Sequence, residues 1–408
     1  MTPYPSKSVA LRQRLVESLR EQGAIETEAV AEAFLAVPRE AFVPLASLEG
    51  LYRDVVVATK FDRLGRSVSS SSQPFIMARM LEMLRPETGQ NVLEIGAATG
   101  YDAALLQTIV GRTGHVTTVE IQVDIASDAR AHLHTAGFDD VEVVTGDGAR
   151  GYQKTAPYDR IIVTASCSDL PLAWWDQMKP DGVLVVPLRR GSLQAVLALR
   201  RTSAGFSSER AVHGFFMSMT GQYAESIHAK ALGPRKDILV SGKASLSGVR
   251  AKLLVELMNS PLRMQEPETL ASALAGSMSA FRYFWDLRAF FATREPDLLE
   301  VQTRNAIYDF QTGLAILNTN DNSLAVLPVH PPFGPLGSPP SGDSQPKPKL
   351  LTFGGENAGN RSLQLVNEYV EMGKPTLDRL HVSLRRLEPP SRSLWSYELS
   401  YAPRSQEP

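Results

Sequence analysis

The sequence predicts an α/β fold in which a doubly wound, mostly parallel sheet is followed by a smaller α+β module. Three observations lead to this expectation. Short apolar segments alternate with helical patterns between residues 74 and 200. The segment 91–95 ends in a glycine-spaced turn, Gly96 to Gly100, and a helical pattern follows it directly. The alternation stops near residue 220, so the remaining residues are expected to form a different kind of module.

Each element of the first module is predicted from its apolar spacing and from the turn residues beside it. Two amphipathic helices are expected within residues 8–37. Strands are expected at 91–95, 115–119, 141–144, 160–163, 183–186 and 195–199. Helices are expected between them at 102–110, 125–135 and 172–178. The predicted sheet should therefore be covered on both faces.

Two domains are predicted, with the boundary at residue 220. Residues 1–220 are divided into N-terminal helices (1–73) and the α/β core (74–220). Residues 221–408 should form a small sheet with a helix on one face, and Phe290 and Phe291 should lie in its core. Its strands are expected at 306–317, 323–329, 349–353, 380–384 and 394–399, with a helix at 362–372. Residues 328–349 are rich in Pro, Gly and Ser, which predicts a flexible loop.

Composition excludes several classes of function. A net charge of −2 gives no electrostatic case for nucleic-acid binding. No apolar run approaches the ~18 residues of a membrane span, and no secretory signal is read at the N-terminus. A single cysteine, Cys167, fits a reducing compartment, so a cytoplasmic location is expected. The seven histidines show no metal-ligand spacing, so no metal is expected, and the oligomeric state stays open.

Three predicted strand ends carry residues suited to a nucleoside. Gly96 and Gly100 allow backbone N–H groups to approach a ligand. Glu120 follows about 20 residues later, at the end of the second strand, where an acid can hold ribose hydroxyls. Asp147, between Gly146 and Gly148, can reach an adenine amine at the third strand end. The loop lacks the Gly-x-Gly-x-x-Gly spacing of dinucleotide sites, so S-adenosylmethionine is the expected cofactor.

Several motifs, in order, resemble the protein-L-isoaspartate O-methyltransferase family over about residues 10–220. They are residues 37–44 (VPREAFVP), 71–74 (SSQP), 93–101, 146–148, 157–165, 170–171 and 178–188. The resemblance implies a Rossmann-like class I S-adenosylmethionine-dependent methyltransferase fold. The residues expected to contact the cofactor are Ser70, Glu94, Gly96, Ala97, Gly100, Glu120, Ile121, Gly146, Asp147, Gly148, Thr164 and Thr220.

The same resemblance implies a catalytic role for Ser72. In the family, a Thr-x-Ser-x-Pro segment places a serine hydroxyl beside the carboxylate that accepts the methyl group, and that serine matches Ser72. Ser70 stands at the threonine position, within an unbroken run of serines from Ser69 to Ser72. The alternative interpretation of such a run is a flexible polar linker.

A narrower resemblance concerns the substrate. The serine run and the long second half resemble methyltransferases of actinobacterial peptide natural-product clusters, which esterify an aspartate of a ribosomally made, often macrocyclic precursor (lanthipeptide, lasso peptide or graspetide). The ester then closes to an aspartimide, which can open to isoaspartate. On this interpretation general repair enzymes lack the extra half. The alternatives are a repair methyltransferase for L-isoaspartyl residues and a non-catalytic peptide-binding module.

Overall fold

The computed structural model describes most of the chain. The described residues are 4–44, 46–191, 193–224, 230–234, 236–242, 248–268, 270, 280–303, 312–329, 349–387 and 394–401. The loop expected at 328–349 falls outside them, except for its first two residues and its last. No helix of the described part of the chain is long and apolar enough to cross a lipid bilayer.

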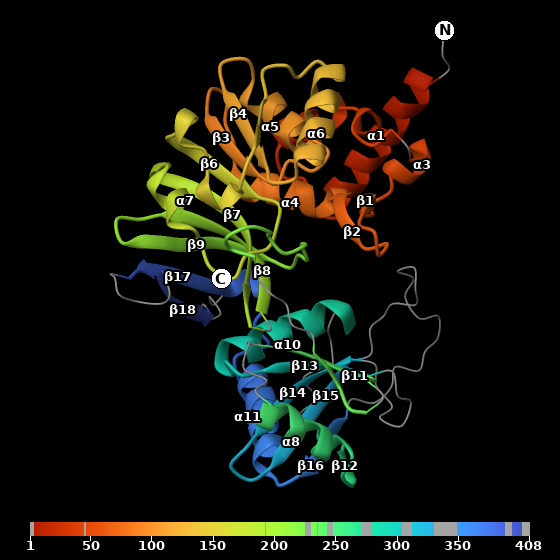
Figure 1. Cartoon of the computed structure of the whole chain (residues 1–408), viewed down its shortest axis with the longest axis vertical. Coiled ribbons are helices and arrows are strands. Elements are labelled where there is room, and N and C mark those ends of the chain that lie inside the picture. Colours follow the sequence, from red (N-terminus) through yellow and green to blue (C-terminus); the bar gives the residue numbers. More distant parts are fainter. Residues whose placement is uncertain are drawn as a thin grey trace.

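A nine-stranded mixed sheet forms the centre of the first module (Figure 1). Its strands, in spatial order, are β18 (Trp395–Tyr401), β17 (Leu380–Arg386), β9 (Gly205–Val212), β8 (Leu193–Arg201), β7 (Met178–Arg190), β6 (Tyr158–Val163), β3 (Asn91–Ile95), β4 (His115–Glu120) and β5 (Glu142–Thr145). The pairings from β7 to β5 are parallel, and those from β7 to β18 are antiparallel. The expectation of a mostly parallel sheet therefore holds only for the half that carries the glycine loop.

The first group of helices covers one of the two faces of the parallel half that the sequence pattern predicted to be covered. They are α1 (Tyr4–Glu21), α2 (Glu28–Ala36), α4 (Pro74–Leu84), α5 (Tyr101–Val110) and α6 (Val123–Thr135), with the short α3 (Leu48–Leu51) beside them. Strand alternation sorts the side chains: Val92 of β3 packs with these helices, whereas Leu93 and Ile95 belong to the core on the opposite face. All but one residue of α5 are buried, so this helix forms the floor beneath the glycine loop.

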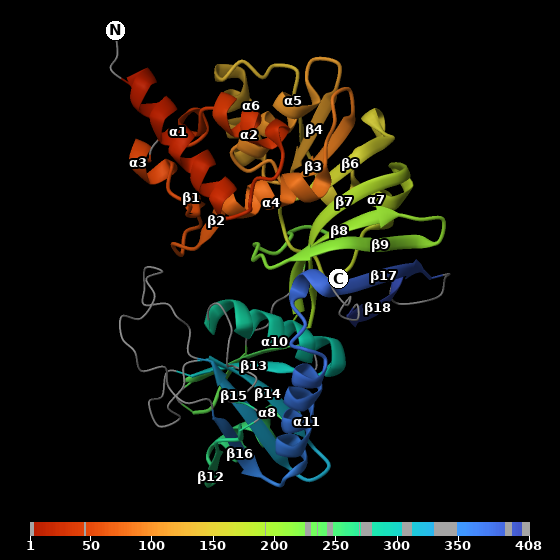
Figure 2. The same cartoon turned by 180° about the vertical axis from the view of Figure 1, so that it is seen from behind.

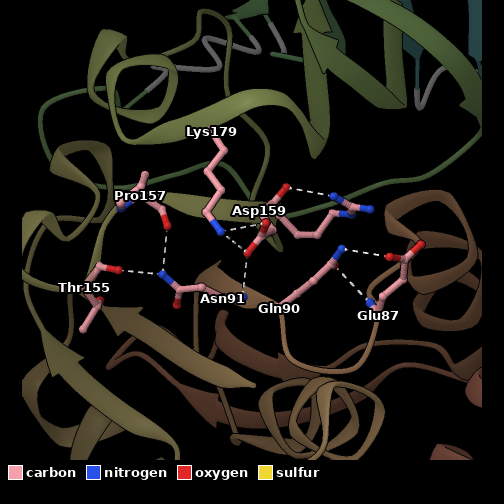
Figure 3. A network of polar contacts seen from close by, with 8 residues as sticks. Glu87, Gln90, Asn91, Thr155, Pro157, Asp159 and Lys179 are labelled. Carbon is pink, nitrogen blue, oxygen red and sulfur yellow. Dashed lines mark hydrogen bonds and ion pairs between the residues drawn. The ribbon is translucent and has the colours of Figure 1, made fainter. Parts of the chain in front are cut away.

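A network of polar contacts ties three strands together at the end of the sheet away from the glycine loop (Figure 3). The Asp159 carboxylate of β6 accepts a hydrogen bond of 2.9 Å from the backbone N–H of Asn91, which begins β3. It also accepts from the Lys179 ammonium of β7 at 2.9 Å. The Asn91 amide donates to the carbonyls of Thr155 and Pro157 at 2.6 and 3.0 Å. These bonds fix the relative positions of β3, β6 and β7. They thereby also fix the direction of β3, at whose other end the glycine loop begins.

The second module is built on a seven-stranded antiparallel sheet. Its strands, in spatial order, are β10 (Lys230–Leu232), β11 (Ile238–Gly242), β13 (Leu299–Thr303), β14 (Thr312–Asn318), β15 (Ser323–Val329), β16 (Leu350–Gly354) and β12 (Leu262–Gln265). One face packs on α8 (Gly248–Met258) and the other on α11 (Asn357–Glu371), with α10 (Ala280–Arg294) beside α11. The sequence predicted a helix on one face only, because short strand and helix signals are mixed over residues 232–259, the stretch that contains α8.

The boundary predicted at residue 220 does not hold at the C-terminal end. β17 and β18, which the sequence assigned to the second module, pair with β9 and extend the first sheet (Figures 1 and 2). Gly205 makes the junction possible, because a side chain there would overlap the Leu384 carbonyl at 2.0 Å. The chain therefore leaves the first module near residue 220 and returns to it at residue 380.

The two modules share one hydrophobic core. A single cluster of buried residues contains Ile161 and Leu184 of the first sheet together with Leu365 and Tyr369 of α11. Phe290 and Phe291 of α10 are buried in the same cluster, in line with the expectation for these aromatic residues. α7 (Leu172–Asp176) completes this face of the first sheet, and its Trp174 is fully buried. The second module is therefore packed onto the first through apolar side chains.

Candidate active site

A cavity of about 670 Å³ opens at the carboxyl ends of β3 and β4. Four stretches of chain form most of its walls. The first is the glycine loop after β3, and the second is the end of the β1–β2 hairpin (Val57–Phe61 and Ser67–Ser71). The third is the first half of α4, and the fourth is the segment 213–220. The crevice outside the carboxyl ends of parallel strands is where such sheets bind ligands.

The glycine loop brings bare backbone to this cavity. Gly96 has φ 101°, and a Cβ there would lie 2.4 Å from the Thr164 hydroxyl oxygen. That hydroxyl donates to the Gly96 carbonyl at 2.8 Å and locks the turn from the neighbouring strand end. Only glycine fits this position, because both the dihedral angle and the space exclude a side chain.

Glu120 supports the loop from β4. Its carboxylate, 8% exposed, accepts hydrogen bonds from the backbone N–H groups of Ala98 at 3.2 Å and Gln122 at 3.1 Å. Each carboxylate oxygen has further lone pairs, and Glu120 also lines the cavity. The acid expected at the second strand end is therefore in place to accept hydrogen bonds from hydroxyl groups of a ligand.

Most of the residues expected to contact the cofactor line the cavity, and so does Ser72, which was expected to be catalytic. The cofactor residues in the lining are Ser70, Glu94, Gly96, Ala97, Glu120, Ile121, Gly148, Thr164 and Thr220. Three do not: Gly100, Gly146 and Asp147. Gly100 packs against α6, where a Cβ would lie 3.2 Å from the Ala129 carbonyl. Its role is therefore close packing of helices beneath the loop.

Asp147 is held away from the cavity by its own partners. Its carboxylate accepts from the Ala149 N–H at 3.0 Å and from the Gln222 N–H at 3.0 Å. Gly221 lies against it, so closely that a Cβ there would be 2.7 Å from the carboxylate oxygen. The third strand end thus reaches the cavity through Gly148, while Asp147 fastens the segment that follows Thr220.

The serine run is a strand and not a linker. β2 pairs with β1 in antiparallel register, with Ser71 opposite Val57 and Ser70 opposite Ala58. The alternation of a strand leaves Ser71 buried and Ser70 and Ser72 half-buried at the cavity wall. The expectation that this run belongs to the site is consistent with its position, and the linker alternative is wrong.

A buried arginine holds the end of this strand. Arg39 is fully buried and donates to the carbonyls of Leu51 and Ser72, both at 2.8 Å. It also donates to the Ser71 hydroxyl at 3.0 and 3.2 Å. Burial lowers the pKa of the Arg39 guanidinium. Asp54 accepts hydrogen bonds from the Gln73 amide and from the Phe75 N–H, both at 2.8 Å, and so holds the start of α4, which begins at Pro74.

Two carboxyl groups lie together in the cavity floor. Glu94 of β3 is 0% exposed and Asp102 of α5 is 9% exposed, and their side chains are within hydrogen-bonding contact. Burial, and then the negative charge of Asp102, raise the pKa of Glu94; burial likewise raises that of Asp102. One oxygen of each group, Glu94 Oε1 and Asp102 Oδ1, has no donor among the described protein atoms. The pair therefore has acceptors to spare for a cationic ligand.

Arg39, Asp54 and Asp102 were not singled out from the sequence. Arg39 lies in a matched motif, but its contacts with Ser71 and Ser72 depend on chain separated from it by more than 30 residues. The sequence around Asp102 could have predicted a buried acid, because Asp102 comes just after the glycine loop and the apolar run Ala103 to Leu106 follows it. An acid on a helix that buries nearly every residue calls for a partner or a ligand.

The residues present fit an S-adenosyl group. The ligand is an adenosine that carries a cationic amino-acid tail. Its adenosine suits the exposed backbone at Gly96 and the acid at the second strand end. Its cationic tail suits the acceptors without donors at Glu94 and Asp102. Among the described residues that line the cavity there is no Lys or Arg, whereas there are four acids: Asp54, Glu94, Asp102 and Glu120. Fold and cavity together define a class I S-adenosylmethionine-dependent methyltransferase, in which the bound cofactor supplies an electrophilic methyl group.

Comparison with known proteins gives the family. The family model for protein-L-isoaspartate(D-aspartate) O-methyltransferase matches residues 10–224. A protein-L-isoaspartate O-methyltransferase of Methanopyrus kandleri is 40% identical over 195 residues, 48% of this chain and 84% of that protein. One of Hyperthermus butylicus is 39% identical over 221 residues, 52% of this chain and 89% of that protein. The chain belongs to the protein-L-isoaspartate(D-aspartate) O-methyltransferase family and is a carboxyl O-methyltransferase.

A solved structure of a protein-L-isoaspartate O-methyltransferase resembles both modules. It superposes with a TM-score of 0.52 at 21% sequence identity, and the match covers 96% of this chain and 99% of that chain. The expectation that the extra half separates this chain from proteins of that name is therefore wrong. The second module is part of a fold already found in the family.

Proposed function

We propose that this enzyme methylates the free carboxylate of an L-isoaspartyl residue in a polypeptide. The observation that carries the proposal is the position of Ser72, whose half-buried side chain lines the cavity beside the glycine loop on a strand end fixed by Arg39. Family membership and relatives at 40% and 39% identity support the isoaspartyl substrate class.

The chemistry asks little of the protein beyond positioning. A carboxylate with a reference pKa of ~3.9 is ionised at neutral pH, so no general base is needed. A serine hydroxyl can donate one hydrogen bond to the oxygen that does not react and so direct the other oxygen. Alignment of two reactants can contribute ~7–11 kcal/mol. Ser72 is assigned the role of the hydrogen-bond donor that orients the substrate carboxylate. Arg39 is a positioning residue that acts on Ser72 through the backbone.

The mouth of the cavity suits a peptide with apolar neighbours to the modified residue. Three exposed apolar side chains line it: Val56 from the hairpin, and Phe215 and Met217 from the segment 213–220. The centre of the Phe215 ring lies 4.4 Å from the centre of the Trp285 ring on α10. His213 also bonds to Asp286 on α10 at 2.8 Å. The second module therefore borders the mouth and can contact residues that flank the carboxylate.

A second candidate substrate is an ordinary aspartyl side chain in a ribosomally made, modified peptide. The observation that favours it is the serine run, in which Ser70 replaces the family's threonine two positions before Ser72. Esterification would convert the carboxylate into an ester with a methoxide leaving group. The nitrogen of the next residue can then close a five-membered imide with loss of methanol. The product would first gain one methylene and finally be one water lighter than the substrate.

A competition between three peptides tests the proposal. They are a linear peptide with one L-isoaspartyl residue, the same sequence with ordinary aspartate, and a macrocyclic peptide with ordinary aspartate. Mass spectrometry with methyl-labelled cofactor reports transfer. The proposal expects methylation of the first peptide alone. Methylation and dehydration of the macrocycle alone would favour the second candidate, and transfer to none of the three by cofactor-bound enzyme would overturn both.

A further inference from the structure

The floor of the cavity contains an arrangement that the methyl-transfer proposal does not use. Glu94 and Asp102 come from adjacent elements, the end of β3 and the first turn of α5, and their carboxyl groups meet within hydrogen-bonding contact. Thr118 of β4 donates to Glu94 Oε2 at 2.5 Å. Glu94 Oε1 and Asp102 Oδ1 receive no hydrogen bond from the described protein groups.

Two carboxylates in this position cannot both stay ionised in the absence of a cation. Each would be buried, and each would face the other without a donor between them. A single proton held between the two groups removes one charge and supplies the missing donor. Carboxyl pairs that share a site titrate as a unit in this way, with one proton bound far more tightly than in water.

Among the described residues, none of the groups around the pair is a cation paired with it. From β4, Glu120 adds further negative charge, and Thr118 is neutral. The Arg39 guanidinium lies on the Tyr101 ring, 5.9 Å from its centre. From α6, His132 bonds to the Thr99 carbonyl at 3.1 Å. α2 and α4 contribute apolar side chains such as Phe34 and Met80 to the core around α5.

We propose that Glu94 and Asp102 together bind the ammonium group at the amino-acid end of the cofactor and release their shared proton as it enters. Of the two cationic groups in S-adenosylmethionine, only the ammonium has N–H donors, and the orphaned oxygens require donors. The sulfonium has none. A divalent metal fits less well, because the described residues contain no group of three or more His, Cys, Asp or Glu side chains arranged to hold one.

The step balances in charge and protons. Before binding, the pair carries one negative charge and one proton. The entering ammonium brings one positive charge, the proton leaves to solvent, and two carboxylates remain around one ammonium. Cofactor binding is therefore linked to pH, with affinity rising as the pH rises through the range in which the pair loses its proton. The inference does not depend on which carboxylate is methylated.

Titration calorimetry of the full-length enzyme with S-adenosylmethionine, in the absence of any acceptor peptide, tests this directly. Buffers of different ionisation enthalpy at one pH report the number of protons released. The wild-type enzyme should release about one proton per cofactor at pH 6 to 6.5, and the affinity should rise up to about tenfold per pH unit there. 5′-Methylthioadenosine, which lacks the amino-acid end, should bind without proton release.

Variants assign the proton to the pair. Asp102→Asn keeps the shape and lets the new amide donate to Glu94, so proton release should disappear and S-adenosylmethionine should bind about 10–100-fold more weakly. Glu94→Gln should behave alike, while 5′-methylthioadenosine affinity should stay within about threefold in both. Asp139→Asn, at an exposed carboxylate paired with His134, is the matched control and should change neither quantity.

Three outcomes would overturn the inference, and the first two need no variant. They are cofactor binding without proton release by the wild type between pH 6 and 7.5, equal proton release with 5′-methylthioadenosine, and unchanged release in Asp102→Asn. None of these bears on the peptide substrate. The peptide competition can fail while the proton count succeeds, so failure of either proposal can be recognised separately.

Discussion

The Arg39 guanidinium donates a 2.8 Å hydrogen bond to the backbone carbonyl of Ser72, across 33 residues of sequence. The same side chain also bonds to Leu51 and Ser71, so one buried cation fixes the end of β2 where it meets the cavity. The position of the Ser72 hydroxyl therefore depends on a residue that lies outside the cavity lining.

Replacement of Arg39 by lysine should impair turnover more than cofactor binding. An ammonium on a single stem cannot satisfy the carbonyls of Leu51 and Ser72 and the Ser71 hydroxyl at once. We expect kcat to fall about 10–100-fold and stability to fall by about 1–3 kcal/mol. Cofactor affinity should stay within about threefold of the wild type, because the glycine loop is untouched. Arg14→Lys, at an exposed position of α1, is the control, and an unchanged kcat in Arg39→Lys would contradict the positioning role.

Loss of the Ser72 hydroxyl should slow methyl transfer. One hydrogen bond to a charged group is worth about 1.5–3 kcal/mol, so Ser72→Ala should lower kcat/KM about 10–150-fold. Steady-state kinetics with the isoaspartyl peptide measure this, and peptide affinity should change little. Ser67→Ala, at the start of β2 and outside the cavity lining, should be neutral. Full turnover by Ser72→Ala would remove Ser72 from the proposed chemistry.

Substitution of Gly96 should abolish the cofactor cradle. In Gly96→Ala the new Cβ would stand 2.4 Å from the Thr164 hydroxyl oxygen, so that the loop or the hydroxyl must move. We expect cofactor affinity to fall at least about tenfold, with a loss of stability of about 1–3 kcal/mol. Gly137→Ala is a matched control, because Gly137 also has positive φ but nothing within 4 Å of its Cβ position. Equal losses of cofactor affinity in both variants would show that backbone strain at positive φ, and not the overlap with Thr164, causes the loss.

The stability of the cofactor-free enzyme should fall as the pH rises, through the Glu94 and Asp102 pair. Burial raises the pKa of Asp102 to about 7, whereas an aspartate in the unfolded chain titrates at ~3.9. The folded state thus binds an extra proton between these values. The contribution of the pair is complete below pH ~4 and is lost as the pH rises through the folded pKa, at up to ~1.4 kcal/mol per pH unit.

Thermal unfolding at pH 5, 6, 7 and 8 measures this effect as the difference between the wild type and Asp102→Asn. The variant should gain stability relative to the wild type with each step upward in pH. Saturating S-adenosylmethionine should remove the gain, since the ammonium then balances the pair. A difference that does not vary with pH would mean that the pair carries no extra proton in the folded state.

The two modules should unfold together. They share one core, and Trp395 of β18 packs on Phe206 of β9, at 5.3 Å between ring centres, while donating to the Leu170 carbonyl at 2.8 Å. Trp395→Ala should cost about 3–5 kcal/mol and lower a single calorimetric transition. Glu398→Ala, at an exposed position of the same strand, should have little effect. Two separate transitions in the wild type would contradict the shared core.

The sequence predicted the parallel half of the first sheet closely, because local periodicity and glycine turns decide those elements. β3, at Asn91–Ile95, begins and ends where it was expected, and β4 is longer by one residue. Asp147 shows where such reasoning stops. Its place at a strand end was correct, but its bonds to Ala149 and Gln222 depend on how the segment after residue 220 folds over it.

The sequence by itself determined the class of cofactor and the strand ends that approach it, since glycine spacing, spaced acids and apolar alternation act within short stretches of chain. Only the tertiary structure decided which side chains meet. Arg39 reaches Ser72, Asp102 faces Glu94, and β17 and β18 return to the first sheet because burial brings together residues whose separation along the chain carries no local signal. The elements that carry these contacts are brought together by removing apolar surface from water, a driving force that has no direction along the sequence.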